Sequence, residues 1–128
     1  MTKPDFSGTW RLNLKKSHLL GAPVAEVEMR IAHDEPDFVQ DIKTVFADGR
    51  IALATFRGVS TGASFENTIG EHAVTSRAIW DGDTLVIESS FAGSRLRDRW
   101  SLSSDGSELH MAHLDDALAG QIAVLERR

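Results

Sequence analysis

The sequence predicts an all-β protein, an antiparallel up-and-down barrel of about eight to ten strands. Three Asp-Gly pairs, at 48–49, 81–82 and 105–106, mark the tight turns that hairpins favour. Between these and other breaks lie segments of about 7–11 residues, a spacing typical of sandwiches and barrels. Apolar and polar side chains alternate within most segments, with the period of two that a half-buried strand requires.

This alternation groups the apolar side chains of each expected strand on one face. The shared faces carry, in chain order, Val27, Met29 and Ile31; Leu85, Ile87, Ser89 and Phe91; Leu96, Asp98, Trp100 and Leu102; Leu109, Met111 and His113; and finally Ile122 and Val124. We expect the groups that include Asp98 and His113 to point toward the interior.

Three stretches are ambiguous. Residues 37–47 and 50–57 carry apolar side chains on both faces, so each is either a strand covered on both sides or one whose register is misjudged. Residues 15–25 can hold a short helical turn or a plain loop.

A meander of strands leaves two exposed edges unless it closes on itself. Closure gives a barrel whose interior can hold one small ligand. A sandwich is the structural rival, but it needs long crossing connections, and nearly every break here is short. The chain of 128 residues fits one domain spanning residues 1–128.

The run Phe6-Ser7-Gly8-Thr9-Trp10 resembles the Gly-x-Trp opening of the calycin superfamily, which includes lipocalins and fatty-acid-binding proteins. The hairpin-rich C-terminal half, from Trp80 to Arg127, is similar to the closing meander of a fatty-acid-binding protein. The resemblance implies that Trp10 lies on the first strand and plugs one end of a lipocalin-like barrel. It also implies a cavity and a small ligand.

The sequence departs from the fatty-acid-binding proteins in two respects. Those proteins carry an Arg-x-Tyr pair near the C-terminus that grips a carboxylate, whereas the nearest positions here are Val124 and Glu126. A negative Glu126 there would repel a fatty-acid head group. The interval between Trp10 and Val27 also leaves little room for the helical lid of those barrels, so fatty-acid specificity is not implied.

We therefore expect a small, largely hydrophobic molecule to bind in the barrel interior. The expected ligand-binding residues are Phe38, Trp80, Phe91, Asp98, Trp100, Met111 and His113. Aromatic side chains would form the cavity wall, and Asp98 with His113 would contact a polar group of the ligand. The alternatives are that Asp98 lies in water at a barrel mouth or pairs with Arg77, and that the aromatic rings meet in a filled barrel.

Two other functions remain open. A raised pKa at Asp98 beside His113 would suit a general acid or base, as in an enzyme acting on a small organic substrate. A filled barrel would instead suit an interaction module that acts through its outer face. No catalytic motif supports the first of these, so no catalytic residue is assigned and a binding protein is favoured over an enzyme.

Composition argues against several partners. The net charge of −5 disfavours nucleic acid. The stripe of Arg95, Arg97 and Arg99 is expected on a solvated outer face, with an anionic partner as the alternative. His110 and His113 would lie on opposite faces of a strand, and the chain has no cysteine, so neither a metal nor a cofactor is expected.

No apolar run approaches the ~20 residues that cross a bilayer, so no membrane span is expected. Residues 1–7 contain no apolar stretch behind Lys3, so we expect no signal peptide and a cytoplasmic location. The sequence does not predict the oligomeric state.

Overall fold

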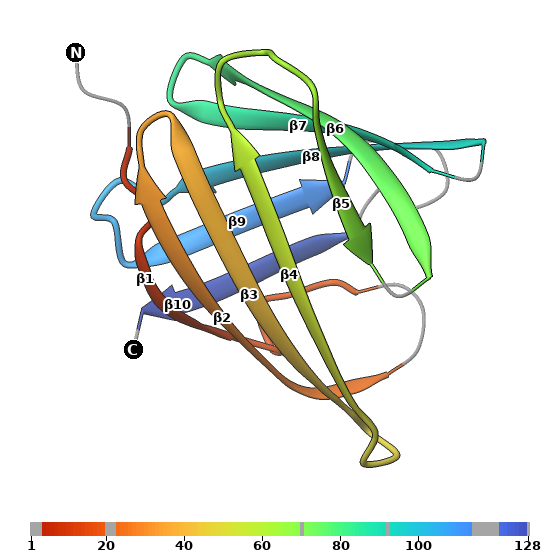
Figure 1. The fold of residues 1–128 in the computed structure, drawn as a ribbon. Helices are drawn as coiled ribbons and strands as arrows, with labels where there is room; N and C mark the ends of the chain where they lie inside the picture. Colours follow the sequence, from red (N-terminus) through yellow and green to blue (C-terminus); the bar gives the residue numbers. More distant parts are fainter. Residues whose placement is uncertain (1–3, 20–22, 70, 92, 114–120, 128) are drawn as a thin grey trace.

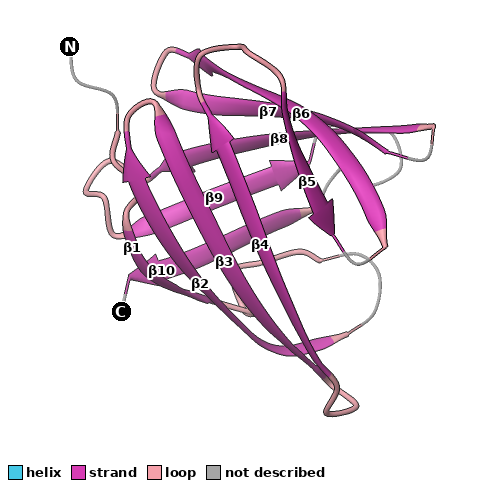
Figure 2. Ribbon diagram, in the orientation of Figure 1, coloured by secondary structure: helices cyan, strands magenta, loops and turns pink. Residues whose placement is uncertain are grey.

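The computed structural model describes residues 4–19, 23–69, 71–91, 93–113 and 121–127, which form one ten-stranded antiparallel sheet (Figures 1 and 2). The strands are β1 (Gly8–Leu12), β2 (Val24–Asp34), β3 (Asp37–Phe46), β4 (Ile51–Val59), β5 (Phe65–Ile69), β6 (His72–Asp81), β7 (Thr84–Phe91), β8 (Ser94–Leu102), β9 (Glu108–His113) and β10 (Ile122–Arg127). The described residues contain no helix, and residues 14–16 form a turn.

The strands follow one another around a nearly closed barrel. Their order in the sheet is β4-β3-β2-β1-β10-β9-β8-β7-β6-β5. Strands that follow one another in sequence are paired, except β4 and β5, and β1 joins the two halves by pairing with β10. Trp10 lies opposite Arg127 in that closing pair. In Figure 1, strands β2–β4 cross in front of β8–β10. The predicted up-and-down barrel is confirmed, and the sandwich alternative is wrong.

The Asp-Gly pairs form the hairpin turns that the sequence predicts. Gly49, Gly82 and Gly106 have φ values of 91°, 63° and 75°. This left-handed region is strained for residues with a Cβ and open to glycine. The turns connect β3 to β4, β6 to β7 and β8 to β9.

The structure resolves the ambiguous register of β3 and β4. On β3, Phe38 and Gln40 are 2% and 5% exposed, so this face points inward. On β4, Ile51 and Leu53 are 60% and 76% exposed. The apolar side chains on the outer face of β4 therefore lie in solvent, and coverage on both sides is excluded for this strand.

The inner face of β10 carries Leu125, which is fully buried, whereas Val124 belongs to the outer face. Val124 is nonetheless buried because the segment after β1 runs along β10, where the Asn13 backbone N–H donates to the Val124 carbonyl at 2.8 Å. Glu126 is exposed on the outside and lies 3.7 Å from the Lys16 ammonium. The expectation that Glu126 repels a head group inside the barrel is therefore wrong.

Trp10 closes one end of the barrel, as the sequence resemblance implies. Its side chain is fully buried, its indole N–H donates to the Phe6 carbonyl at 2.9 Å, and the Arg127 guanidinium lies 4.3 Å from its ring centroid. Phe6 is 1% exposed and packs against the rings of Trp80 and Trp100. The N-terminal segment thus fills this end with aromatic side chains.

Glycine at position 58 of β4 allows aromatic rings to pack closely beside this strand as well. A Cβ there would lie 2.5 Å from Phe65 Cζ and 2.7 Å from Phe38 Cζ. These distances are too short for van der Waals contact, so any larger residue would push the two rings apart. The missing side chain lets Phe38 and Phe65 meet edge to face, with ring centroids 6.0 Å apart.

The described ladder is interrupted only between β4 and β5, which end the strand order. One side chain bridges this gap: the Arg57 backbone N–H donates to Asn67 Oδ1, and Asn67 Nδ2 donates to the Arg57 carbonyl, both at 2.9 Å. The Asn67 amide therefore takes the place of a paired strand at one position.

Replacing Asn67 with alanine should remove both bonds and destabilise the barrel by about 1 kcal/mol, since the bonds are exposed. Amide hydrogen exchange at Arg57 should accelerate. Asn67→Asp is the matched control, because a carboxylate still accepts from the Arg57 N–H but cannot donate to its carbonyl. Unchanged exchange at Arg57 in the alanine variant would show that the amide does not hold the gap.

Candidate functional site

A cavity of about 420 Å³ occupies the barrel interior beyond the aromatic end. Its described lining comes from eight strands and from the residue before β10. The lining side chains are Met29, Gln40, Ile42, Phe56, His72, Val74, Ile87, Ser89, Leu96, Asp98, Trp100, Met111, Gln121 and Ala123. A cavity of this size falls in the range of small-molecule sites.

The base of the cavity is the aromatic cluster that fills the closed end. Trp100 lines the cavity and is 4% exposed, and its ring packs edge-on against Phe38 and Phe6 with centroids 5.6 and 5.9 Å away. The barrel is therefore filled at one end and hollow at the other. Because close-packed rings leave little free volume, the cavity begins where the aromatic side chains stop.

Polar side chains enter the cavity from opposite walls. Gln40 on β3 is only 5% exposed, and its amide Nε2 lies 3.0 Å from Met29 Sδ. Asp98 on β8 is half-buried, with Ile87 of β7 as its register partner on one side. Ser89 on β7 also lines the cavity, and its hydroxyl shares a hydrogen bond of 2.8 Å with that of the buried Ser76 on β6.

The structure brings three of the seven expected binding residues to the cavity: Asp98, Trp100 and Met111. Phe38 and Trp80 lie in the aromatic packing at the closed end and are not among the described lining residues. The backbone of His113 pairs with that of Asp98. The side chains of His113 and Phe91 lie outside the described residues.

Sequence reasoning missed four polar lining residues, Gln40, His72, Ser89 and Gln121. Gln40 stands two positions from both Phe38 and Ile42, so the period of two places all three on one face. The apolar residues on the other face of the segment, Val39 and Val45, masked this signal. Ala123 was missed for a related reason, because Ile122 and Val124 made the opposite face of β10 the more apolar one.

A hydrogen-bonded cluster ties the N-terminal segment to the closed end. The His33 ring, 3% exposed, accepts from the Phe6 backbone N–H at Nδ1 and lies 2.8 Å from the Glu35 carboxylate through Nε2. Ser60 and the Trp80 indole N–H also donate to Glu35. Burial raises the pKa of Glu35, but the hydrogen bonds from Ser60, Trp80 and His33 outweigh it and hold the pKa below its usual 4.5.

A lowered pKa in the folded state means that the contribution of Glu35 to stability is present above about 4.5 and is lost as the pH falls below that value. We therefore expect the free energy of unfolding to drop on acidification below pH 4.5. Glu35→Gln should lower the free energy of unfolding by about 1 kcal/mol at pH 7, since the site is partly exposed. The variant should also show a smaller drop in this free energy below pH 4.5 than the wild type. Urea unfolding between pH 3 and 7 measures both effects; parallel curves for the two proteins would contradict the assignment.

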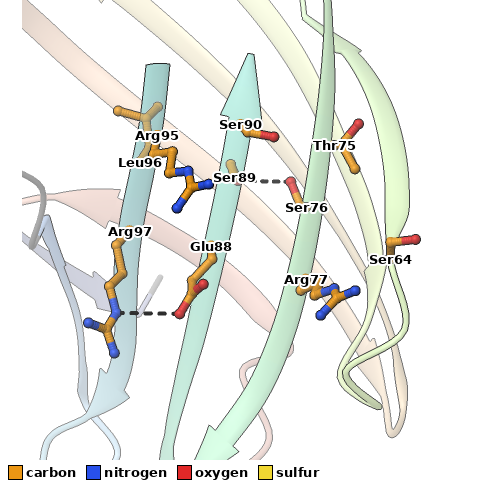
Figure 3. Close-up of a pocket in the computed structure, with 10 residues that line it drawn as sticks. All are labelled: Ser64, Thr75, Ser76, Arg77, Glu88, Ser89, Ser90, Arg95, Leu96 and Arg97. Atoms are coloured by element: carbon orange, nitrogen blue, oxygen red, sulfur yellow. Dashed lines mark hydrogen bonds and ion pairs between the residues drawn. The ribbon is translucent and has the colours of Figure 1, made fainter. Parts of the chain in front are cut away.

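An open pocket of about 780 Å³ lies across β6–β8 beside Ser64 (Figure 3). Its lining combines Ser89 and Leu96, which also line the cavity, with outward-facing charged residues. Arg77, Glu88 and Arg97 form one row across it, and Arg97 Nε lies 3.8 Å from Glu88. Arg99 pairs with Asp81 at 3.7 Å. The arginine stripe thus lies on the expected outer face opposite acidic neighbours, and the alternative that Asp98 pairs with Arg77 is wrong.

His110 lies on the outer side of β9, where its Nε2 is 3.1 Å from Glu108 and its side chain is 42% exposed. No group of three potential metal ligands occurs among the described residues. Likewise, the described residues include no helix that is long and apolar enough to cross a membrane.

The barrel has counterparts among solved protein structures. No protein-family model and no curated protein matches the sequence. Among solved structures, the REP1-NXSQ fatty acid transporter superposes with a TM-score of 0.73 at 14% identity, covering 95% of both chains. The chain shares the barrel fold of this structure.

Two further structures support this fold assignment. Human cRBP IV superposes with a TM-score of 0.65 at 16% identity, covering 98% of this chain and 99% of the other. A variant of the fluorescent protein UnaG superposes at 0.66 and 17% identity, covering 96% and 94%. The calycin resemblance seen in the sequence is therefore confirmed at the level of the fold.

Proposed function

We propose that this protein binds one small, largely apolar molecule in the hollow end of its barrel. The observation that carries the proposal is the 420 Å³ cavity, whose described lining is dominated by apolar side chains such as Ile42, Val74 and Met111. Transfer of an apolar molecule from water into such a space is favourable in proportion to the area removed from water.

The similar structures support this proposal. One of them is named a fatty acid transporter and shares the barrel over nearly its full length. Asp98, Trp100 and Met111 are the predicted binding residues that line the space, and Gln40 joins them. A filled barrel acting only as an interaction module is less consistent with a cavity of this size.

Titration with Nile red, an uncharged apolar dye, tests the proposal. We expect saturable binding of one dye per chain, with a blue shift of its emission as it leaves water. Native mass spectrometry of the protein purified from its own host should show a co-purifying small molecule. Absence of saturable binding in the first experiment and of any bound molecule in the second would contradict the proposal.

The single domain, the cytoplasmic location and the lack of a nucleic-acid partner stay predictions from the sequence. We propose no catalytic step, because the His113 side chain, which the enzyme alternative pairs with Asp98, lies outside the described residues.

A further inference from the structure

The charged side chains of the described cavity lining are unbalanced. The lining contains one carboxylate, that of Asp98, and no lysine or arginine; its other polar side chains are those of Gln40, His72, Ser89 and Gln121. Arg77 and Arg97 belong to the outer faces of the neighbouring strands β6 and β8 and line the adjoining pocket, which shares Ser89 and Leu96 with the cavity. A ligand with a negative charge would therefore meet Asp98 inside the cavity without a described lysine or arginine to offset the repulsion.

Gln40 adds a second acceptor. Its amide nitrogen is used by the contact with Met29 Sδ, while its carbonyl oxygen has no hydrogen-bond partner among the described residues. The side chain is only 5% exposed and lines the cavity. Because a buried carbonyl without a donor costs free energy, a ligand that donates a hydrogen bond to Gln40 would remove that cost.

Asp98 can also accept a hydrogen bond from a ligand. It lies between Trp100 and Leu96 on the inner face of β8, and its register partner on β7 is Ile87, which is 1% exposed. A carboxylate offers about four lone-pair sites, so it can accept from a ligand in addition to any bond within the protein. In apolar surroundings, a donor or a positive charge stabilises the ionised carboxylate and a second negative charge destabilises it.

We propose that the ligand carries a hydrogen-bond-donating polar group without negative charge, an alcohol or a protonated amine, and that the cavity rejects carboxylates. This inference rests on the proposed binding function and specifies the chemical class of the ligand. Gln40 and Asp98 supply the acceptors from opposite walls, and the apolar lining holds the rest of the molecule.

Three ligands of equal chain length test the proposal: dodecanol, dodecylamine and dodecanoate, each used below its micellar concentration to displace Nile red at pH 7. At this pH the amine is protonated and the acid is ionised. We expect the alcohol and the amine to displace the dye at concentrations at least about tenfold below that of dodecanoate. The stronger of the two identifies whether the head group is neutral or cationic.

Asp98→Asn removes the negative charge of the side chain and nearly keeps its shape. This variant should bind dodecanoate about tenfold more tightly than the wild type and bind the amine more weakly. Glu66→Gln is the matched control, because it removes the same charge from the exposed face of β5 and should leave the order of the three ligands unchanged. Gln40→Leu should weaken dodecanol binding more than dodecanoate binding, and thermal melts confirm that each variant is folded.

The outcomes distinguish this proposal from the function on which it rests. Tightest binding of dodecanoate by the wild type would overturn the proposed ligand class and leave the binding function intact. An unchanged order of ligands in folded Asp98→Asn would overturn the role of Asp98. Failure of Nile red and all three ligands to bind would overturn the binding function itself.

Discussion

Replacing Trp10 with alanine should destabilise the barrel by about 3–5 kcal/mol, the range seen for large aromatic truncations in protein cores. Its indole is fully buried at the closed end and donates to the Phe6 carbonyl, and the Arg127 guanidinium stacks on its ring. The variant would lose the packing that joins the N-terminal segment to β10. A whole domain is stable by only about 5–15 kcal/mol, so the protein should be close to unfolding.

Urea unfolding followed by far-ultraviolet circular dichroism measures this loss. Trp10→Phe is the graded control, because a phenyl ring keeps part of the packing and loses the N–H bond, so its cost should be clearly smaller. Phe6 should lose its burial in the alanine variant only, which fluorescence of Trp80 and Trp100 would detect. Equal stability of the wild type and the alanine variant would show that Trp10 does not hold the barrel closed.

Replacing Ala123 with tryptophan should abolish ligand binding while leaving the fold intact. Ala123 lines the cavity on β10, and its register partner Met111 lines it from β9. An indole side chain there would occupy much of the 420 Å³ space. We expect Nile red affinity to fall by at least about tenfold, with a stability change within about 1–3 kcal/mol, as is usual for added bulk in a core.

Ala73→Trp provides the matched control for this experiment. Ala73 lies on β6 beside the cavity residue Val74 but is exposed on the outer face. The same bulk placed there should leave dye binding unchanged. Equal Nile red affinity for Ala123→Trp and the wild type would locate the dye outside the cavity and would contradict the proposed site.

The inner faces of most strands could be predicted from the sequence because side-chain direction in a strand is a local property. Met29, Ile87 and Trp100 were assigned to the interior by the period of two alone, and all three are buried. The inner face of β3, and with it the position of Gln40, could not be assigned in this way, because both faces of that strand carry apolar residues.

The position of a residue along the barrel axis could not be predicted in this way. Phe38 and Gln40 share the inner face of β3, yet Phe38 packs in the aromatic cluster and Gln40 lines the cavity. Height along the axis depends on strand tilt and on the stagger between all strands of a closed sheet. Trp80 was placed in the cavity wall by its size, whereas the stagger brings it to Phe6 and Glu35 at the closed end.

The sequence by itself determined the strands, their hairpin turns and the plug at Trp10, because turn chemistry and alternation act over a few neighbouring residues. Only the tertiary structure decided which end of the barrel is hollow and which side chains meet there. Gln40 and Asp98 are distant in the chain and line one cavity only because the sheet closes through β1 and β10. Closure is a property of all ten strands together, and it sets the chemistry of the site.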